Sequence, residues 1–260
     1  MTIALIGAGN MGEAILAGVC NKYPCVVCEP RVERRAYLTK KYRCSLADTP
    51  AQAAVVADIV LLAVKPQDLP GVLADIKPVV KKQVFVSIAA GITSAFIEKS
   101  LGGKVRVVRS MPNLPALIRE GMTGVCKGRY AAVSDLKKAC DILASVGQVM
   151  VVPEKMIDAV TAVSGSGPAY VFLFVECLMQ AARKLGFNEA QAKTLVLQTL
   201  LGSVHMAAGS KDSAGVLRQK VTSKGGTTQA AMDVFMARGV FDIYLEALTA
   251  AKQRARELAQ

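Results

Sequence analysis

The segment that decides the fold is Thr2-Ile3-Ala4-Leu5-Ile6-Gly7-Ala8-Gly9-Asn10-Met11-Gly12. Its apolar beginning is typical of a buried strand, and the residues after Gly9 have the pattern of a helix. Glycines spaced G-x-G-x-x-G between a strand and a helix are typical of a dinucleotide-binding turn. Gly7 permits the tight turn, Gly9 lets the backbone approach a pyrophosphate, and Gly12 lets the helix pack on the sheet. The pyrophosphate would then lie at the N-terminus of this helix.

The remainder of the first 150 residues alternates strand-like and helix-like segments. The strands that we predict after the first one are Cys25–Cys28, Asp58–Val64, Gln83–Ile88, Lys104–Val108, Thr123–Cys126 and Gln148–Val152. The helices that we predict among them are Met11–Val19, Val32–Tyr42, Ala47–Ala57, Leu69–Lys77, Thr93–Leu101 and Ser134–Val146. Apolar strands that alternate with helices indicate an α/β fold with a doubly wound, mostly parallel sheet. We therefore predict a Rossmann-type, NAD(P)-binding domain over residues 1–152.

The chain after residue 152 shows helical patterns only. The predicted helices are Met156–Val163, Pro168–Leu185, Glu189–Ala208, Ala214–Lys220, Gln229–Ala237 and Phe241–Leu258. Several are apolar on more than one face, for example over Ala169–Val175, and such a helix must be buried. This block has more apolar surface than a lone bundle can cover. We expect residues 153–260 to form an all-α domain that binds substrate and dimerises.

Composition excludes several other classes of protein. With 52% hydrophobic and 20% charged residues, the chain is not a disordered protein. Its longest apolar run, Ala51–Val64, is shorter than the roughly 20 residues that cross a membrane, and we find no pattern of a secretion signal. Cys25 and Cys28 would face opposite sides of a strand, so we expect reduced, buried thiols rather than a metal site. These features indicate a cytoplasmic protein without a metal or a membrane partner.

Part of the net charge of +12 comes from the basic segment Arg31–Arg43. This segment is either a solvated helix face or a site that binds an anion. No nucleic-acid module accompanies it, so we expect no nucleic-acid partner. Glu29 lies 20 residues after Gly9, where an acid would bind the ribose 2′-hydroxyl of NAD. Arg31, Arg34 and Arg35 follow directly, and an Arg there can hold the 2′-phosphate of NADP. These residues alone are compatible with either NAD or NADP as the cofactor.

Further loops follow strands on the side of the sheet where ligands bind in such folds. The predicted cofactor-contacting residues in these loops are Ala63, Val64, Lys65, Pro66, Ala89, Ala90 and Asn113. For Lys65, a backbone contact is favoured over a role as a catalytic amine. In the helical half, Val221–Thr228 holds glycines, hydroxyl residues and free N–H groups at a helix start, which suits a carboxylate. The single His, His205, lies within an apolar helical run and is expected to be non-catalytic.

At this point the sequence resembles the pyrroline-5-carboxylate reductase family. The segments that carry the resemblance are Gly7–Gly12, Ala63–Gln67, Ser87–Gly91, Met111–Asn113, Val163–Tyr170 and Val221–Thr228. They occur in the family's order along the whole chain. The resemblance implies NAD(P)H-dependent hydride transfer to 1-pyrroline-5-carboxylate, giving L-proline in the last step of proline biosynthesis. It also implies a homodimer or a ring of dimers.

The resemblance further implies roles for individual residues. Thr228 matches the threonine near the ring nitrogen, and Ser166 lies on the opposite wall of the pocket. The residues implied to hold the substrate carboxylate are Ser223, Gly225, Gly226 and Thr227. The implied cofactor is NADPH, with NADH possible, and its predicted contacts are Gly7, Ala8, Gly9, Asn10, Met11 and Gly12 together with Glu29 and Arg31.

The sequence departs from the family at Leu114, where a Thr is usual, and at Glu29, where a small or polar residue suited to NADPH is frequent. Two alternatives stay open beside the resemblance. One is a related imine or β-hydroxyacid reductase with the same two-domain plan. The other is a dinucleotide-binding regulator without turnover.

Overall fold

The computed structural model describes residues 1–258 of the chain in two compact units. The first unit is Met1–Pro168 together with the segment that begins at Ala250, and the second is Ala169–Thr249. Each unit is described by itself. A functional boundary after residue 152 stays a prediction.

The first unit is built on an eight-stranded sheet in the order β3-β2-β1-β4-β5-β6-β7-β8. All neighbouring strands are parallel except β6 and β7. The strands are β1 (Ile3–Ile6), β2 (Cys25–Cys28), β3 (Ser45–Ala47), β4 (Ile59–Leu62), β5 (Val84–Ser87), β6 (Arg106–Met111), β7 (Gly121–Lys127) and β8 (Gly147–Val151). The predicted α/β class with a mostly parallel sheet is confirmed.

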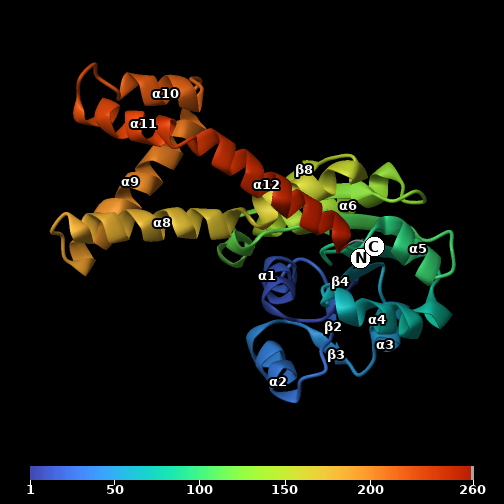
Figure 1. Cartoon of the computed structure of the whole chain (residues 1–260). Coiled ribbons are helices and arrows are strands. Elements are labelled where there is room, and N and C mark those ends of the chain that lie inside the picture. Colours follow the sequence, from blue (N-terminus) through green and yellow to red (C-terminus); the bar gives the residue numbers. More distant parts are fainter. Residues whose placement is uncertain (259–260) are drawn as a thin grey trace. The chain divides into compact units, whose positions relative to one another are not determined.

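Helices cover both faces of this sheet, as a doubly wound fold requires. They are α1 (Asn10–Val19), α2 (Val32–Lys41), α3 (Pro50–Val55), α4 (Leu69–Ile76), α5 (Ser94–Ser100), α6 (Val133–Leu143) and the short α7 (Ile157–Val160). Leu5 packs in the core with residues of α1 and α6, whereas Ile6 packs in the opposite core with residues of α3, α4 and α5. Figure 1 shows α1 and α2 on one side of β2–β4 and α3 and α4 on the other.

The predicted helix Ala47–Ala57 is shorter in the structure, and a strand that the sequence did not predict precedes it. Ser45–Ala47 is a strand, β3, which pairs in parallel with β2. Helix α3 begins only at Pro50, and the Thr49 hydroxyl accepts the backbone N–H of Gln52 at 3.2 Å. Pairing with β2 at the sheet edge therefore overrides the helical pattern at Ala47, while the predicted cap with Pro at the first helical position is present.

The cysteines agree in part with the expectation of buried thiols. Cys25 and Cys28 belong to the cores on opposite faces of the sheet, and all seven cysteines are free in the described part of the chain. Burial raises the pKa of Cys25 and of Cys126 to about 12. Cys177 is an exception to the expectation, because it is exposed in the single chain.

The second unit consists of helices with large exposed apolar side chains. The helices of the C-terminal half are α8 (Gly167–Lys184), α9 (Glu189–Gly209), α10 (Ala214–Lys220), α11 (Thr227–Ala237) and α12 (Val240–Glu257). Val171, Phe172 and Leu173 of α8 are each more than half exposed. The helical stretch Glu154–Lys184 is long and apolar enough to cross a membrane, by length and composition only.

Gly147 provides a test of the sheet. Its φ is +145°, and a Cβ there would lie 2.0 Å from the backbone oxygen of Gly121 on β7. Gly147→Ala is therefore expected to lower the free energy of unfolding by more than about 2 kcal/mol, because neither backbone strain nor the clash can relax cheaply.

Gly71→Ala is the matched control, since an added methyl group at this α4 residue meets no atom of residues 1–258 within 4 Å. It should leave stability unchanged or raise it slightly. Urea unfolding of both variants checks the prediction, and equal midpoints would contradict it.

Candidate functional site

The carboxyl ends of β1, β2, β4 and β5 lie at one edge of the sheet. Ile6 pairs with Cys28 on one side and with Leu62 on the other, and Leu62 pairs with Ser87. Because these strands are parallel and in register, the loops that follow them leave the sheet at the same edge. The structure thus brings the glycine-rich turn, Glu29, the Ala63–Pro66 loop and the Ile88–Gly91 loop to one place, where ligands bind in this class of sheet.

The three glycines of the turn are needed for different reasons. Gly7 has φ +86°, and a Cβ there would lie 2.8 Å from Ala63 O. At Gly12 a Cβ would lie 2.4 Å from Gly7 O. At Gly9 a Cβ would meet no atom of residues 1–258 within 4 Å, and its φ of −65° suits any residue. The folded chain therefore requires glycine at 7 and 12, whereas at 9 glycine leaves room for another molecule.

Helix α1 begins directly after Gly9, which is its N-cap residue and provides no side-chain capping bond. The first N–H groups of a helix lack partners within the helix, and the helix dipole adds partial positive charge there. Open space at Gly9 beside these donors fits the pyrophosphate of a dinucleotide. The residues present thus fit the cofactor that the sequence predicts.

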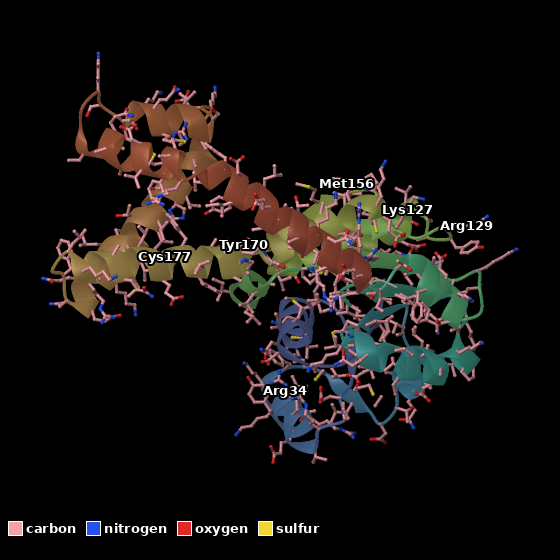
Figure 2. All side chains as sticks on the ribbon, viewed as in Figure 1. Arg34, Lys127, Arg129, Met156, Tyr170 and Cys177 are labelled. Atoms are coloured by element: carbon pink, nitrogen blue, oxygen red, sulfur yellow. The ribbon has the colours of Figure 1, made fainter. Side chains whose placement is uncertain are left out.

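The peptide group of Ala8 is held from both sides. Its N–H donates to Glu29 Oε2 at 3.0 Å, and its carbonyl accepts from Arg34 Nε at 2.9 Å. Arg34 lies on α2 (Figure 2) and its guanidinium also pairs with Glu13 of α1. Hydrogen bonds to charged groups are stronger than neutral ones, so these contacts fix the orientation of the turn.

Glu13 is the centre of a polar cluster that fixes α2 against α1. Its Oε1 accepts from Tyr42 at 2.7 Å and from Lys41 and Tyr37 at 3.0 Å each. Burial raises the pKa of Glu13, but the hydrogen bonds from Tyr42, Lys41, Tyr37 and Arg34 outweigh it and lower the pKa to about 2. Arg34 is therefore committed to this cluster and to Ala8.

Glu29 and Arg31 form a close pair at the end of β2. Glu29 Oε1 accepts from Arg31 Nε at 2.7 Å and from the Arg31 backbone N–H at 3.2 Å, and Oε2 accepts from Arg31 Nη2 at 3.3 Å. Burial raises the pKa of Glu29, but the hydrogen bonds from Arg31 and Ala8 bring it below its ordinary value. The next arginine, Arg35, pairs with Asp48 at 2.6 Å. Each arginine of the predicted phosphate site thus has its own carboxylate.

The other loops of the first unit have mixed roles. Lys65 is exposed, and Ala89 is buried. Asn113 Nδ2 donates to Ser164 O at 3.0 Å, and its Oδ1 accepts from Met122 N at 2.8 Å. Asn113 therefore ties the end of β6 to the segment before Ser166. A cofactor contact of Lys65, Ala89 or Asn113 stays a prediction.

Ser166 follows a π-helical turn, Thr161–Gly165, although the sequence predicts an ordinary helix that ends at Val163. Its N–H donates to Thr161 O at 2.8 Å, which closes the wider turn. Such turns are rare in proteins as a whole, but those that occur are often found at functional sites. The only sequence signal for it is the Ser164–Pro168 run of small residues and proline.

The sequence did not predict an ion network that lies near this turn, around the buried side chain of Arg109. Arg109 is 4% exposed and contacts Glu154 and Asp158, each at 3.4 Å. Glu154 also accepts from the N–H and the hydroxyl of Ser94, at 2.8 and 2.6 Å. Arg109 therefore has a structural role in joining α5 and α7 to the sheet.

The Val221–Thr228 loop belongs to the second unit. Gly226 is the N-cap of α11 and makes no side-chain capping bond, so this helix also starts with free N–H groups. A Cβ at Gly226 would lie 2.3 Å from Ser223 Oγ, and Gly225 has φ +71°. Ser223 and Thr227 are exposed, and Thr228 is partly buried. The arrangement can bind a carboxylate through backbone N–H groups and hydroxyls.

The doubly wound sheet and its glycine turn define a dinucleotide-binding protein of the Rossmann class. Residues 2–91 match the family described as NADP oxidoreductase, coenzyme F420-dependent, and residues 154–258 match the pyrroline-5-carboxylate reductase dimerisation family. The pyrroline-5-carboxylate reductase of Pseudomonas aeruginosa is 41% identical over 99% of this chain and 97% of its own length. The chain belongs to the pyrroline-5-carboxylate reductase family.

Solved structures agree with this assignment. A pyrroline-5-carboxylate reductase of Coxiella burnetii superposes with a TM-score of 0.93 at 37% identity, covering 99% of this chain and 98% of that one. The Plasmodium falciparum pyrroline carboxylate reductase, whose structure holds NADP, superposes with a TM-score of 0.90 at 30% identity, covering 100% and 98%.

Gly9→Ala tests the turn as a cofactor site. Because the methyl group meets no protein atom, the melting temperature should stay within about 2 °C of the wild type. NADPH binding, followed by its fluorescence, should weaken more than about tenfold because the methyl group occupies the space left for phosphate. Gly71→Ala, with equal open space on α4, serves as control. Unchanged NADPH affinity in Gly9→Ala would refute the assignment.

Proposed function

We propose that this protein reduces 1-pyrroline-5-carboxylate to L-proline with NADPH, and with NADH as a second cofactor, in the last step of proline biosynthesis in the cytoplasm. The proposal rests on one observation. This chain, a member of the family, has two helices with glycine as the N-cap residue: Gly9 at α1 and Gly226 at α11. Each offers free N–H groups to an anion. One suits the cofactor pyrophosphate, and the other suits the substrate carboxylate.

The substrate is a cyclic imine that carries a carboxylate, and protonation at nitrogen makes it a good hydride acceptor. When bound, the nicotinamide supplies the hydride. The protein must therefore align the imine carbon with the nicotinamide. Supplying a strong acid is less important. Holding two reactants in a near-attack geometry is worth roughly 7–11 kcal/mol of the barrier.

The substrate loop is proposed to hold the carboxylate and the ring nitrogen separately. The hydroxyl of Thr228 hydrogen-bonds the nitrogen, and Ser166 is proposed as a further substrate contact. The proposed carboxylate ligands are Ser223, Gly225, Gly226 and Thr227. The single histidine, His205, is exposed on α9. A hydroxyl group or a water molecule is therefore proposed as the donor of the proton to the ring nitrogen.

A related reductase of another imine or of a β-hydroxyacid has the same two-domain plan. A non-catalytic regulator would bind NADPH without oxidising it. A substrate panel separates these alternatives: NADPH oxidation with pyrroline-5-carboxylate and none with other cyclic imines or with β-keto acids supports the proposal. The intact loop at Gly225–Thr228 favours an enzyme, because a sensor of the cofactor alone needs no second anion site.

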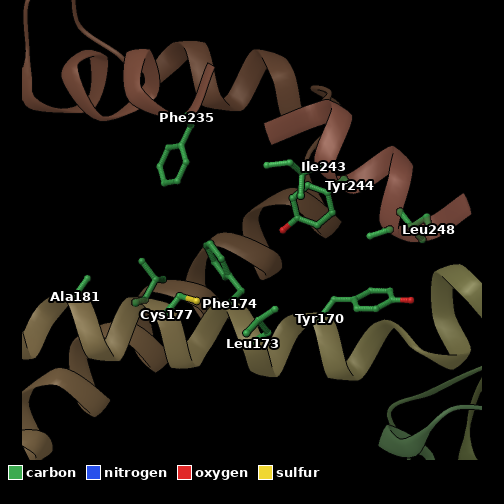
Figure 3. A pocket seen from close by; sticks show the side chains of 11 residues that line it. Tyr170, Leu173, Phe174, Cys177, Ala181, Phe235, Ile243, Tyr244 and Leu248 are labelled. Carbon is green, nitrogen blue, oxygen red and sulfur yellow. The ribbon is translucent and has the colours of Figure 1, made fainter. Parts of the chain in front are cut away.

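The helical half makes the protein a homo-oligomer. An apolar groove of about 480 Å³ lies within the second unit. Figure 3 shows the side chains of α8, α11 and α12 that line it. Its lining includes Tyr170, Leu173, Phe174, Cys177, Phe235 and Tyr244. We propose a dimer in which a second chain covers this surface, and a ring of such dimers as the larger assembly. A partner helix would also explain why an apolar helix such as α8 is exposed in the single chain.

Thr228→Ala is expected to lower kcat/KM for the imine about 10- to 100-fold, because a hydrogen bond to a charged ring nitrogen is lost. NADPH affinity should be unchanged. Thr228→Ser keeps the hydroxyl and should recover most of the activity. Wild-type kinetics in Thr228→Ala would remove Thr228 from the mechanism.

Leu173→Glu is expected to break the dimer, because it would place a charge in the covered groove. Light scattering should then give the mass of a single chain, 27.4 kDa, instead of an even multiple of it. Val133→Glu introduces the same charge at an exposed apolar residue of α6, outside the groove, and should leave the assembly intact. An unchanged mass in Leu173→Glu would show that this surface is not the interface.

A further inference from the structure

The pair Glu29–Arg31 lies at the end of β2, beside the glycine-rich turn. We propose that Arg31 binds the 2′-phosphate of NADPH, and that Glu29 does not bind the ribose but holds Arg31 in place. The inference rests on the proposed dinucleotide site and is independent of the substrate that is reduced. An acidic residue at the end of the second strand usually selects for NAD. Here the acid is proposed to favour NADPH instead.

The first observation is that the hydrogen-bonding capacity of Glu29 is used up. A carboxylate offers about four lone-pair positions on its two oxygens. Oε1 accepts from the backbone N–H and from Nε of Arg31, and Oε2 accepts from Ala8 N–H and from Arg31 Nη2. The Glu29 side chain is 3% exposed. A ribose hydroxyl would have to displace Arg31 before Glu29 could accept its proton.

The second observation is the exposure of Arg31. Its side chain is 64% exposed, although Nε and Nη2 are bound to Glu29. Guanidinium carries five N–H donors and no acceptor, so the donors not used by Glu29 face outward. The pair is electrically neutral as a whole, but the surface that it offers consists of donors only. Such a surface suits a phosphate and has nothing to accept a ribose hydroxyl.

The third observation is that the neighbouring arginines are committed elsewhere. Arg34 binds Ala8 O and Glu13, and Arg35 binds Asp48. Arg31 and Arg34 are both anchored at the glycine-rich turn, Arg31 through Glu29 and Arg34 through Ala8 O, but the Arg34 side chain is only 22% exposed whereas that of Arg31 is 64% exposed. A 2′-phosphate near the end of β2 would therefore meet Arg31 first.

The test measures binding of two cofactor fragments by calorimetry, without turnover. Adenosine 2′,5′-bisphosphate carries the 2′-phosphate, and 5′-AMP has the free 2′-hydroxyl. The wild type should prefer the bisphosphate. Arg31→Met should weaken binding of the bisphosphate about 10- to 100-fold and tighten that of 5′-AMP several-fold, because Glu29 is then free to accept the hydroxyl. Arg31 is exposed, so the variant should fold.

Two further variants make the outcome decisive. Arg35→Met removes the same charge four residues further along the chain, on α2, and it should change bisphosphate binding less than about threefold. In the double variant Glu29→Gln/Arg31→Met, the gain in 5′-AMP affinity should disappear, because that gain depends on the Glu29 carboxylate. Dissociation constants of NADPH and NADH, measured by fluorescence, should follow the two fragments.

Several results would overturn the inference. Equal losses in Arg31→Met and Arg35→Met would indicate a general charge effect. An unchanged preference in Arg31→Met would show that the 2′-phosphate binds elsewhere. Failure of the wild type to bind either fragment would count against the dinucleotide site as a whole, and this outcome is distinct from a site that binds both fragments equally.

Discussion

The close approach of the glycine-rich turn to the strand beside it is the constraint on which the site depends. Gly7 and Gly12 leave no room for a side chain because Ala63 O and Gly7 O lie where their Cβ atoms would be. This packing brings the start of α1 to the end of β1, at the point where the sheet order reverses direction. Glu29 and Arg34 then fix the Ala8 peptide between them. The free N–H groups of α1 acquire a defined direction only because these contacts hold the turn.

Much of this arrangement could be predicted from the sequence. The glycine spacing, the Val- and Ile-rich strands and the Thr49–Pro50 cap are local signals, and the structure contains each of them. The strand β3 could not be predicted, because its three residues are stabilised by pairing with β2 rather than by their own pattern. The π-helical turn before Ser166 was missed for a similar reason, since its shape depends on hydrogen bonds that propensity does not describe.

Charged residues were harder to interpret than glycines. Arg31, Arg34 and Arg35 look alike in the sequence, yet the structure gives each a different carboxylate: Glu29, Glu13 and Asp48. Arg109 directly follows the predicted strand Lys104–Val108, as a cofactor-binding residue would, but in the structure it lies within β6, where its buried side chain pairs with Glu154 and Asp158. The role of a charged side chain depends on partners that are distant in the sequence, whereas a glycine motif depends on its own backbone. A glycine motif is therefore easier to interpret from the sequence than a charged side chain.

The most direct test of the proposed reaction follows one atom from cofactor to product. NADPH deuterated at both hydrogens of nicotinamide C4 is supplied with 1-pyrroline-5-carboxylate, and the proline formed is examined by mass spectrometry and NMR. The account predicts one deuterium per proline, at C5, the former imine carbon. Proline without deuterium, or no proline while NADPH is bound, would contradict hydride transfer to the cyclic imine.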